Sequence, residues 1–169
     1  MKTILTPVDF SSATRGVIAV ALDLARTTGG RVVLLHAVQH PVITTDYGLT
    51  AEVLQQTIEA NETAARRQIA HLEKSLADQG VAVTSRLAGG FAAGNIIEEA
   101  GKLHADYVVL GSHGHTAFYD LLVGSTTSAV LKKAPCPVVI VPPERKKAAS
   151  EARLEGSAQP AIGGSPSPM

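Results

Sequence analysis

The stretch Arg31–Val38, RVVLLHAV, is a nearly continuous run of apolar residues. A short run without polar alternation is typical of a strand in a parallel sheet that is covered by helices on both faces. On both sides of this stretch, short apolar runs alternate with longer amphipathic ones, which favours an α/β fold. The expected strands are 3–9, 31–38, 81–88, 105–111 and 136–142.

The segments between these strands have the period of amphipathic helices. We expect the first helix to open at Ser11 or Ser12, which are good N-cap residues, and to close at Gly29 or Gly30. The other three helices are expected at about 50–79, 92–104 and 125–133. The resulting fold class is a single five-stranded parallel sheet with helices on both faces, for which the common strand order is 3-2-1-4-5.

The composition excludes several classes of function. The 15 Lys and Arg residues balance the 15 Asp and Glu residues, so no overall charge attracts nucleic acid or an anionic membrane. Cys136 is the only cysteine, which rules out an intrachain disulfide or a multi-thiolate metal site. No segment approaches the roughly 18 apolar residues of a membrane span. We therefore expect a soluble, cytoplasmic protein with no membrane insertion and no nucleic-acid partner.

The composition changes after Pro142. Residues 143–169 are rich in Pro, Gly, Ser and Ala and contain almost no large apolar residues. Such a segment cannot bury enough apolar surface to offset the entropy of ordering. We expect one domain over 1–142 and a disordered tail over 143–169.

Two unusual loops are predicted to meet at one end of the sheet. Ligands of open parallel sheets bind beyond the carboxyl ends of the strands, where the strand order reverses. In the order 3-2-1-4-5, the first and fourth strands flank that point. Pro7 and Asp9 lie at the end of the first strand, and Gly111 ends the fourth. The sequence therefore predicts a crevice between these two strand ends.

The stretch Gly111–Ser128, GSHGHTAFYDLLVGSTTS, contains the features of a phosphate site. Gly111 and Gly114 allow the backbone to approach a ligand, because they carry no Cβ atom. Gly124 leads into a helix start, where free N–H groups and hydroxyl side chains suit phosphate oxygens. On spacing alone, a simple turn followed by a helix capped by Ser125 explains these residues equally well.

Other polar residues leave alternatives open. Asp9 suits either a turn or N-cap ahead of the first helix or a contact with ribose hydroxyls. His113 and His115 form an H-x-H pair, but no third ligand is nearby, so we expect no metal site. His36 lies within an apolar strand, where a hydrogen-bonded core histidine is the simplest interpretation.

The spacing Gly111-x2-Gly114-x9-Gly124-Ser125 resembles the ATP-binding signature of the universal stress protein family. The segments ILTPVDFS, VVLLHAV, ADYVVLGSHGHT and APCPVVIVP are similar to that family in the same order. The resemblance covers about 1–142. It implies a Rossmann-like domain that binds an adenine nucleotide, ATP with or without Mg²⁺, and a homodimer formed through the fifth strand.

The resemblance also implies roles for individual residues. Pro7, Val8 and Asp9 would border the adenosine, with Asp9 on the ribose, and Ala37 would offer its backbone to the adenine edge. The glycine loop would wrap the ribose and phosphates, and the following helix start would hold the phosphates. These residues are Gly111, Ser112, His113, Gly114, His115, Thr116, Gly124, Ser125, Thr126 and Thr127.

Nothing in the sequence favours rapid catalysis. The Walker signature is absent, and the glycine stretch contains no lysine or arginine to stabilise a transferring phosphoryl group. We therefore name no catalytic residue and expect a nucleotide-dependent regulator of a stress response with little or no hydrolysis. The alternatives are a slow ATPase at the same site and an interaction dimer that binds no nucleotide.

Overall fold

The computed structural model describes residues 1–39, 51–112 and 124–142 of the chain. The expected tail, 143–169, and most of the glycine stretch, 113–123, lie outside the described residues. Within the described ranges, no helix combines the length and the apolar character that a membrane span requires.

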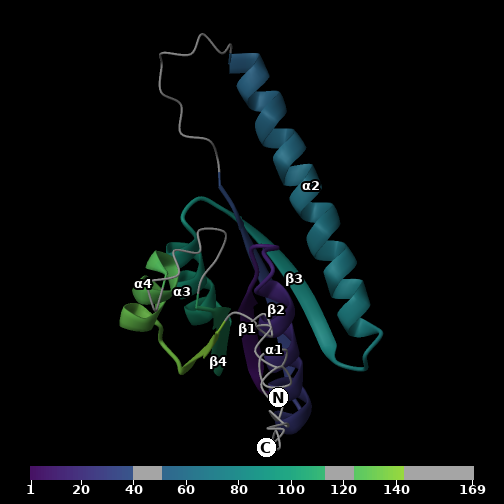
Figure 1. Ribbon diagram of the computed structural model, residues 1–169, viewed down its shortest axis with the longest axis vertical. Helices are drawn as coiled ribbons and strands as arrows, with labels where there is room; N and C mark the ends of the chain where they lie inside the picture. The colour runs from purple at the N-terminus through teal and green to yellow at the C-terminus, as the bar shows by residue number, and fades with distance from the viewer. Residues whose placement is uncertain (40–50, 113–123, 143–169) are drawn as a thin grey trace, which may run out of the picture.

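Five parallel strands form one sheet in the order β3-β2-β1-β4-β5, which confirms the predicted fold class and strand order (Figure 1). The order reverses between β1 and β4, so these two strands flank the switch point. Their bounds are β1 Thr3–Pro7, β2 Arg31–Val38, β3 Ala82–Gly89, β4 Tyr107–Gly111 and β5 Val138–Val141.

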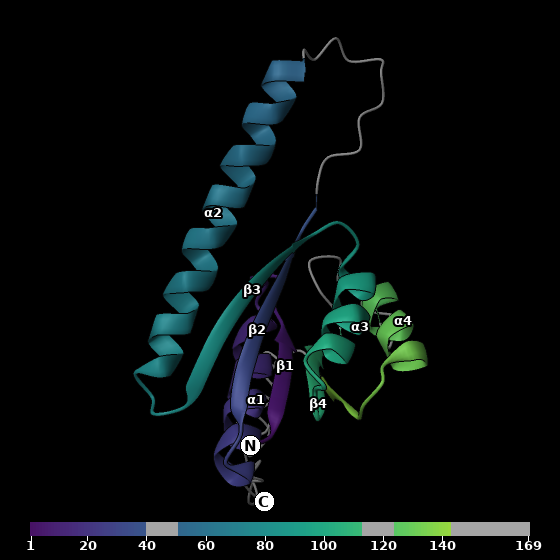
Figure 2. The same cartoon turned by 180° about the vertical axis from the view of Figure 1, so that it is seen from behind.

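The described helices cover both faces of the sheet (Figure 2). One apolar cluster joins the sheet to the first two helices, and a second cluster joins it to the last two. The helices are α1 Thr14–Thr28, α2 Ala51–Ala77, α3 Ala92–Lys102 and α4 Ser125–Lys133.

The continuous apolar character of β2 follows from its place inside this sandwich. β2 pairs with β1 on one side and with β3 on the other. Its side chains alternate between the two cores, so Leu34 packs toward α1 and α2, and Leu35 packs toward α3 and α4. Both are at most 1% exposed, and burial of one such side chain contributes about 1.5–3 kcal/mol.

α1 begins later than the sequence predicts. Its first residue is Thr14, and its N-cap, Ala13, makes no side-chain capping hydrogen bond. Ser11 and Ser12 instead lie in a turn between β1 and the helix, so the prediction of a serine cap is wrong. The predicted end is confirmed, because Gly29 caps the helix in the left-handed region with φ of 62°.

α2 is the longest described helix, with 27 residues. Its amino-terminal half reaches beyond the end of the sheet (Figure 1). Its later turns pack on the sheet, where Ala65, Ile69 and Leu76 are buried. The middle of the helix therefore passes the carboxyl end of β2, which brings its side chains close to the predicted crevice.

Candidate functional site

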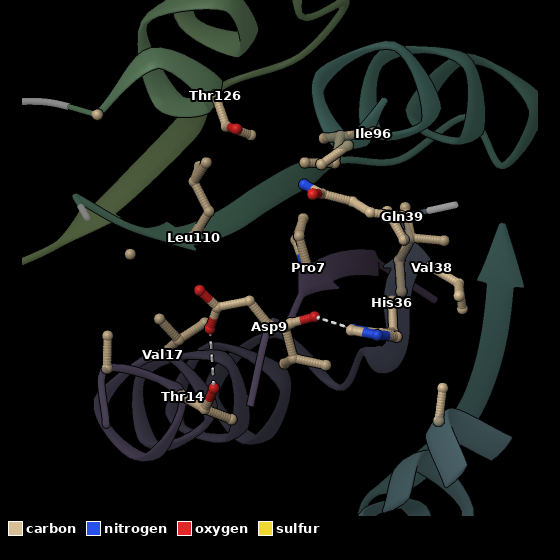
Figure 3. A pocket seen from close by; sticks show the side chains of 18 of the residues that line it. Pro7, Asp9, Thr14, Val17, His36, Val38, Gln39, Ile96, Leu110 and Thr126 are labelled. Carbon is tan, nitrogen blue, oxygen red and sulfur yellow. Dashed lines mark hydrogen bonds between the residues drawn. The ribbon is translucent and has the colours of Figure 1, made fainter. Parts of the chain in front are cut away.

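A cleft of about 600 Å³ opens at the carboxyl ends of β1, β2 and β4 (Figure 3). Its volume lies within the range of about 300–1,000 Å³ that is common for small-molecule sites. The cleft lies at the predicted switch point and brings together nine of the predicted contacts. These are Pro7, Val8, Asp9, Ala37, Gly111, Gly124, Ser125, Thr126 and Thr127.

Five predicted contacts do not line the described cleft. His113, Gly114, His115 and Thr116 lie outside the described residues. Ser112 is described but is only 6% exposed. Its N–H donates to the Val141 carbonyl at 2.9 Å, and its carbonyl accepts from the Gly124 N–H at 2.8 Å. Ser112 therefore connects the end of β5 to the start of α4.

Asp9 lies in the turn between β1 and α1, and its carboxylate is held from the α1 side. Oδ1 accepts a hydrogen bond from the Ser11 N–H at 3.0 Å and another from the Thr14 hydroxyl at 3.4 Å. In Figure 3 the carboxylate lies between Thr14 and Leu110 at the cleft. These local bonds agree with the interpretation that Asp9 forms the turn. Its position in the cleft is also compatible with the interpretation that it contacts a ribose.

The start of α4 forms the opposite wall. Gly124 is the N-cap, and among the described residues no side chain makes a capping hydrogen bond there. The Ser128 N–H is the first to bond within the helix, to the Gly124 carbonyl at 2.9 Å. The N–H groups of Ser125, Thr126 and Thr127 therefore have no intrahelical acceptor, and the positive end of the helix dipole lies at the cleft.

The hydroxyl groups on this helix start are not equivalent. The Thr127 hydroxyl donates to the Gly111 carbonyl at 2.8 Å, and the residue is 4% exposed. Its single proton is therefore already used, and donation to a ligand would require that this bond break. Ser125 is exposed and Thr126 is half-buried, and both line the cleft.

The electrostatic character of the cleft is set by few groups. Asp9 and His36 are the only titratable side chains among the described lining residues, and neither Lys nor Arg is among them. Across the described ranges, no group of three or more His, Cys, Asp and Glu side chains is arranged to hold a metal ion. An anion at this site would therefore be bound mainly by backbone N–H groups and hydroxyls.

Several lining residues were missed by the sequence analysis. His36 was expected in the core, but it is half-buried and lines the cleft, so that expectation is wrong. The expectation that it is hydrogen-bonded is confirmed by its bond to the Val8 carbonyl at 2.8 Å. Asn61 and Gln68 of α2 also line the cleft. No signal in the sequence separates these two from solvent-facing residues, because the crossing of α2 over the sheet determines which face they occupy.

Comparisons with known proteins agree with this architecture. Residues 1–142 match the universal stress protein family. Universal stress protein A homolog 1 from Coxiella burnetii is 29% identical over 143 residues, which cover 83% of this chain and 95% of that protein. A universal stress protein from Thermus aquaticus is 31% identical over 146 residues, which cover 83% of this chain and 98% of that protein.

Solved structures show the same fold. The universal stress protein UspA from Lactobacillus plantarum has a TM-score of 0.73 at 25% identity, covering 83% of this chain and 97% of that one. A universal stress protein from Archaeoglobus fulgidus, solved in complex with dAMP, has a TM-score of 0.58 at 20% identity, covering 83% and 97%. A further universal stress protein structure, solved in complex with cAMP, has a TM-score of 0.53 at 18% identity, covering 84% of this chain and 97% of that one. This chain belongs to the universal stress protein family.

Proposed function

We propose that this universal stress protein binds ATP in the cleft and acts as a nucleotide-dependent regulator in a stress response. The observation that carries the proposal is the convergence of Asp9, at the end of β1, with the start of α4, which no described side chain caps, on one cleft. The two elements supply complementary chemistry, since a carboxylate accepts from ribose hydroxyls and a helix start binds phosphate.

The adenosine half of the ligand is expected along β1 and β2. Pro7 and Val8 lead to Asp9, whose Oδ1 is already oriented by Ser11 and Thr14. Ala37 lies on β2 beside this turn and lines the same cleft. A carboxylate that is held in place before the ligand arrives loses less entropy on binding, which favours affinity.

The phosphates are expected at the start of α4. Ser125 and Thr126 contribute two hydroxyls and, with Thr127, three backbone N–H groups that have no intrahelical acceptor. The helix dipole adds a favourable interaction with an anion of about 0.3–1 kcal/mol at an exposed site. Mg²⁺ would then be held by the phosphates themselves, because the described residues offer no cluster of ligands for it.

The side chains that line the cleft favour ATP binding with little or no hydrolysis. Rapid phosphoryl transfer uses metal ions and cationic side chains to neutralise the charge that develops on the phosphoryl group. The described lining of the cleft contains neither lysine nor arginine. The structures solved with dAMP and cAMP show that other proteins of this fold accommodate an adenine nucleotide.

The test measures nucleotide binding by calorimetry and by thermal shift with ATP, ADP and AMP, each with and without Mg²⁺. ATP at about a hundred times its Kd should stabilise the folded protein by about 2.7 kcal/mol. Asp9→Ala should weaken binding at least tenfold, whereas Asp106→Asn, at the opposite end of the sheet, should leave it unchanged. If no nucleotide raises the melting temperature of the wild type, the proposal is wrong.

The experiment must also distinguish a regulator that only binds ATP from a slow ATPase that uses the same site. Phosphate release is followed under the same conditions, with Ser125→Ala as the variant. Release at several turnovers per minute that is abolished in Ser125→Ala would identify an enzyme. Binding without such release supports the regulatory role.

We also propose that the chain forms a homodimer through β5. Among the described residues, β5 is an edge strand that pairs only with β4, and all four of its residues, Val138–Val141, are apolar and half-buried. An apolar edge strand is an aggregation hazard unless another segment covers it. Sedimentation at micromolar concentration should show a dimer, and a monomer alone would contradict this proposal.

A further inference from the structure

The turn between β1 and α1 contains a backbone conformation that needs support. Phe10, directly after Asp9, has φ of 60°, in the left-handed region. A bulky aromatic residue rarely adopts this conformation, because its Cβ atom crowds the backbone there. Such residues persist only where the surrounding structure holds them, and they cluster at functional sites. The contacts that hold this turn are therefore informative.

His36 of β2 makes two of these contacts from one side chain. Its Nδ1 lies 2.8 Å from the Val8 carbonyl oxygen, and its ring centroid lies 4.5 Å from that of Phe10, with the two ring planes at 43°. Because a carbonyl oxygen can only accept, Nδ1 must carry the proton in this bond. Figure 3 shows the His36 ring beside the turn, on the same cleft as Asp9.

Asp9 lies between the two residues that His36 contacts. Val8 precedes it and also donates its N–H to the Leu35 carbonyl of β2 at 2.8 Å. Phe10 follows it, and the Ser11 N–H then closes back onto the Asp9 carboxylate at 3.0 Å. The direction of the carboxylate thus depends on the backbone on both of its sides, and His36 supports both sides.

We infer that His36 is a positioning residue of the cleft, which holds the turn at Val8 and Phe10 and so orients Asp9 toward the ligand. It acts through the turn, and contact between His36 and the ligand is not required. The identity of the ligand rests on the proposed function, but the support of the turn does not.

Two substitutions separate the two contacts. His36→Asn places an amide nitrogen close to the position of Nδ1, so it keeps the donor and loses the ring. His36→Phe keeps a ring against Phe10 and loses the donor. His71→Phe, on the exposed face of α2, is the matched control for the same chemical change away from the cleft. Phe10→Leu removes the ring contact from the other side, so it should behave like His36→Asn. His36→Leu, which also lacks the donor, is the second route if His36→Phe does not fold.

The first readouts require no ligand. Imidazole ¹⁵N shifts in the wild type should show the Nδ1–H tautomer at His36, and the Nε2–H tautomer would overturn the inference. Amide hydrogen exchange at Ser11 reports the bond to Asp9. We expect exchange to be about tenfold faster in His36→Phe, as for the loss of one hydrogen bond, and within about threefold of the wild type in His36→Asn. Unchanged exchange in His36→Phe, or equal acceleration in both variants, would overturn it.

The last readout is the dissociation constant for ATP. His36→Phe should weaken binding about tenfold, with His36→Asn and His71→Phe close to the wild type. If ATP binds the wild type and His36→Phe equally well, the positioning role is wrong and the proposed function stands. If ATP does not bind the wild type but Ser11 exchange follows the expected pattern, the proposed function is wrong and the support of the turn by His36 stands.

Discussion

The amino-terminal and carboxyl ends of the sheet each contain an aspartate beside β1 or β4, but the two ends are built differently. At the amino-terminal end, Lys2 Nζ lies 2.7 Å from Asp106 Oδ1, and Asp106 Oδ2 accepts from the Thr3 N–H at 2.8 Å. These bonds join the start of β1 to the start of β4. At the carboxyl end the same two strands lead into a cleft of about 600 Å³. The two strands are bonded together at the first end and border a cleft at the second.

One aspartate at each end shows what the difference means. The Lys2 ammonium, which donates a hydrogen bond to Asp106, lowers the pKa of that carboxyl, and the Thr3 N–H lowers it further. Asp9 accepts from a backbone N–H and a threonine hydroxyl, which orient its carboxylate. Changes at Asp106 should therefore alter the free energy of unfolding and leave binding unchanged, and changes at Asp9 should alter binding.

The largest effect on stability is expected from Gly30→Ala, at the amino-terminal end. A Cβ atom at Gly30 would lie 2.7 Å from the Lys2 carbonyl oxygen and 3.0 Å from Thr28 Oγ1, so the backbone must shift. We expect the free energy of unfolding to fall by about 2–3 kcal/mol, with the ATP affinity of the folded protein unchanged. Urea unfolding and calorimetry measure the two quantities.

Gly94→Ala is the matched control for this substitution. A Cβ atom at Gly94 in α3 meets nothing within 4 Å, so the change should stabilise the protein by about 0.5–1 kcal/mol through helix propensity alone. Equal effects of the two alanines would show that the packing of the amino-terminal end does not matter.

A smaller effect is expected from Thr127→Val at the carboxyl end. Valine keeps the shape of the side chain but removes the donor to the Gly111 carbonyl, and the loss should cost about 1–2 kcal/mol of unfolding free energy. Thr126→Val should cost less stability and should weaken ATP binding more. If Thr127→Val weakens binding without a change in stability, Thr127 acts as a ligand contact and not as a support for Gly111.

The smallest effect is expected from Asp106→Asn, and it should depend on pH. The pKa of Asp106 is lowered in the folded protein from its ordinary value of 3.8, so the ionised group contributes stability above that value. This contribution is lost as pH falls through the lowered pKa. The variant should therefore be less stable near neutral pH and lose less stability on acidification, as followed by urea unfolding between about pH 7 and pH 2. Parallel curves for the two proteins would contradict the role of Lys2.

Two elements were predictable from local pattern, because a continuous apolar run indicates β2, and a glycine followed by hydroxyl residues indicates the start of α4. β2 occupies the expected Arg31–Val38, and α4 occupies the expected Ser125–Lys133. The start of α1 was not predictable from capping preferences. The turn at Phe10 occupies the residues ahead of the helix, so α1 begins later than the serines suggest. A side chain of β2, His36, supports the conformation of that turn.

The residues of the candidate site also fall into those that the sequence predicts and those that it does not. Asp9 and the helix start at Ser125 were predictable, since each combines a strand or helix end with a characteristic side chain. His36, Asn61 and Gln68 were not, because nothing in their local sequence distinguishes a residue of the cleft from one of the core or of the solvent-facing surface. Their role depends on which elements end beside them.

The sequence by itself determined the alternation of strands and helices, the two-sided burial of β2 and the residues at the ends of β1 and β4. Each of these follows from periodicity and from local backbone preferences. Only the tertiary structure decided that α2 passes the end of β2, that Thr127 bonds to Gly111 and that His36 supports the turn at Asp9. These contacts join residues from different elements, and their energies depend on distances that no local pattern encodes.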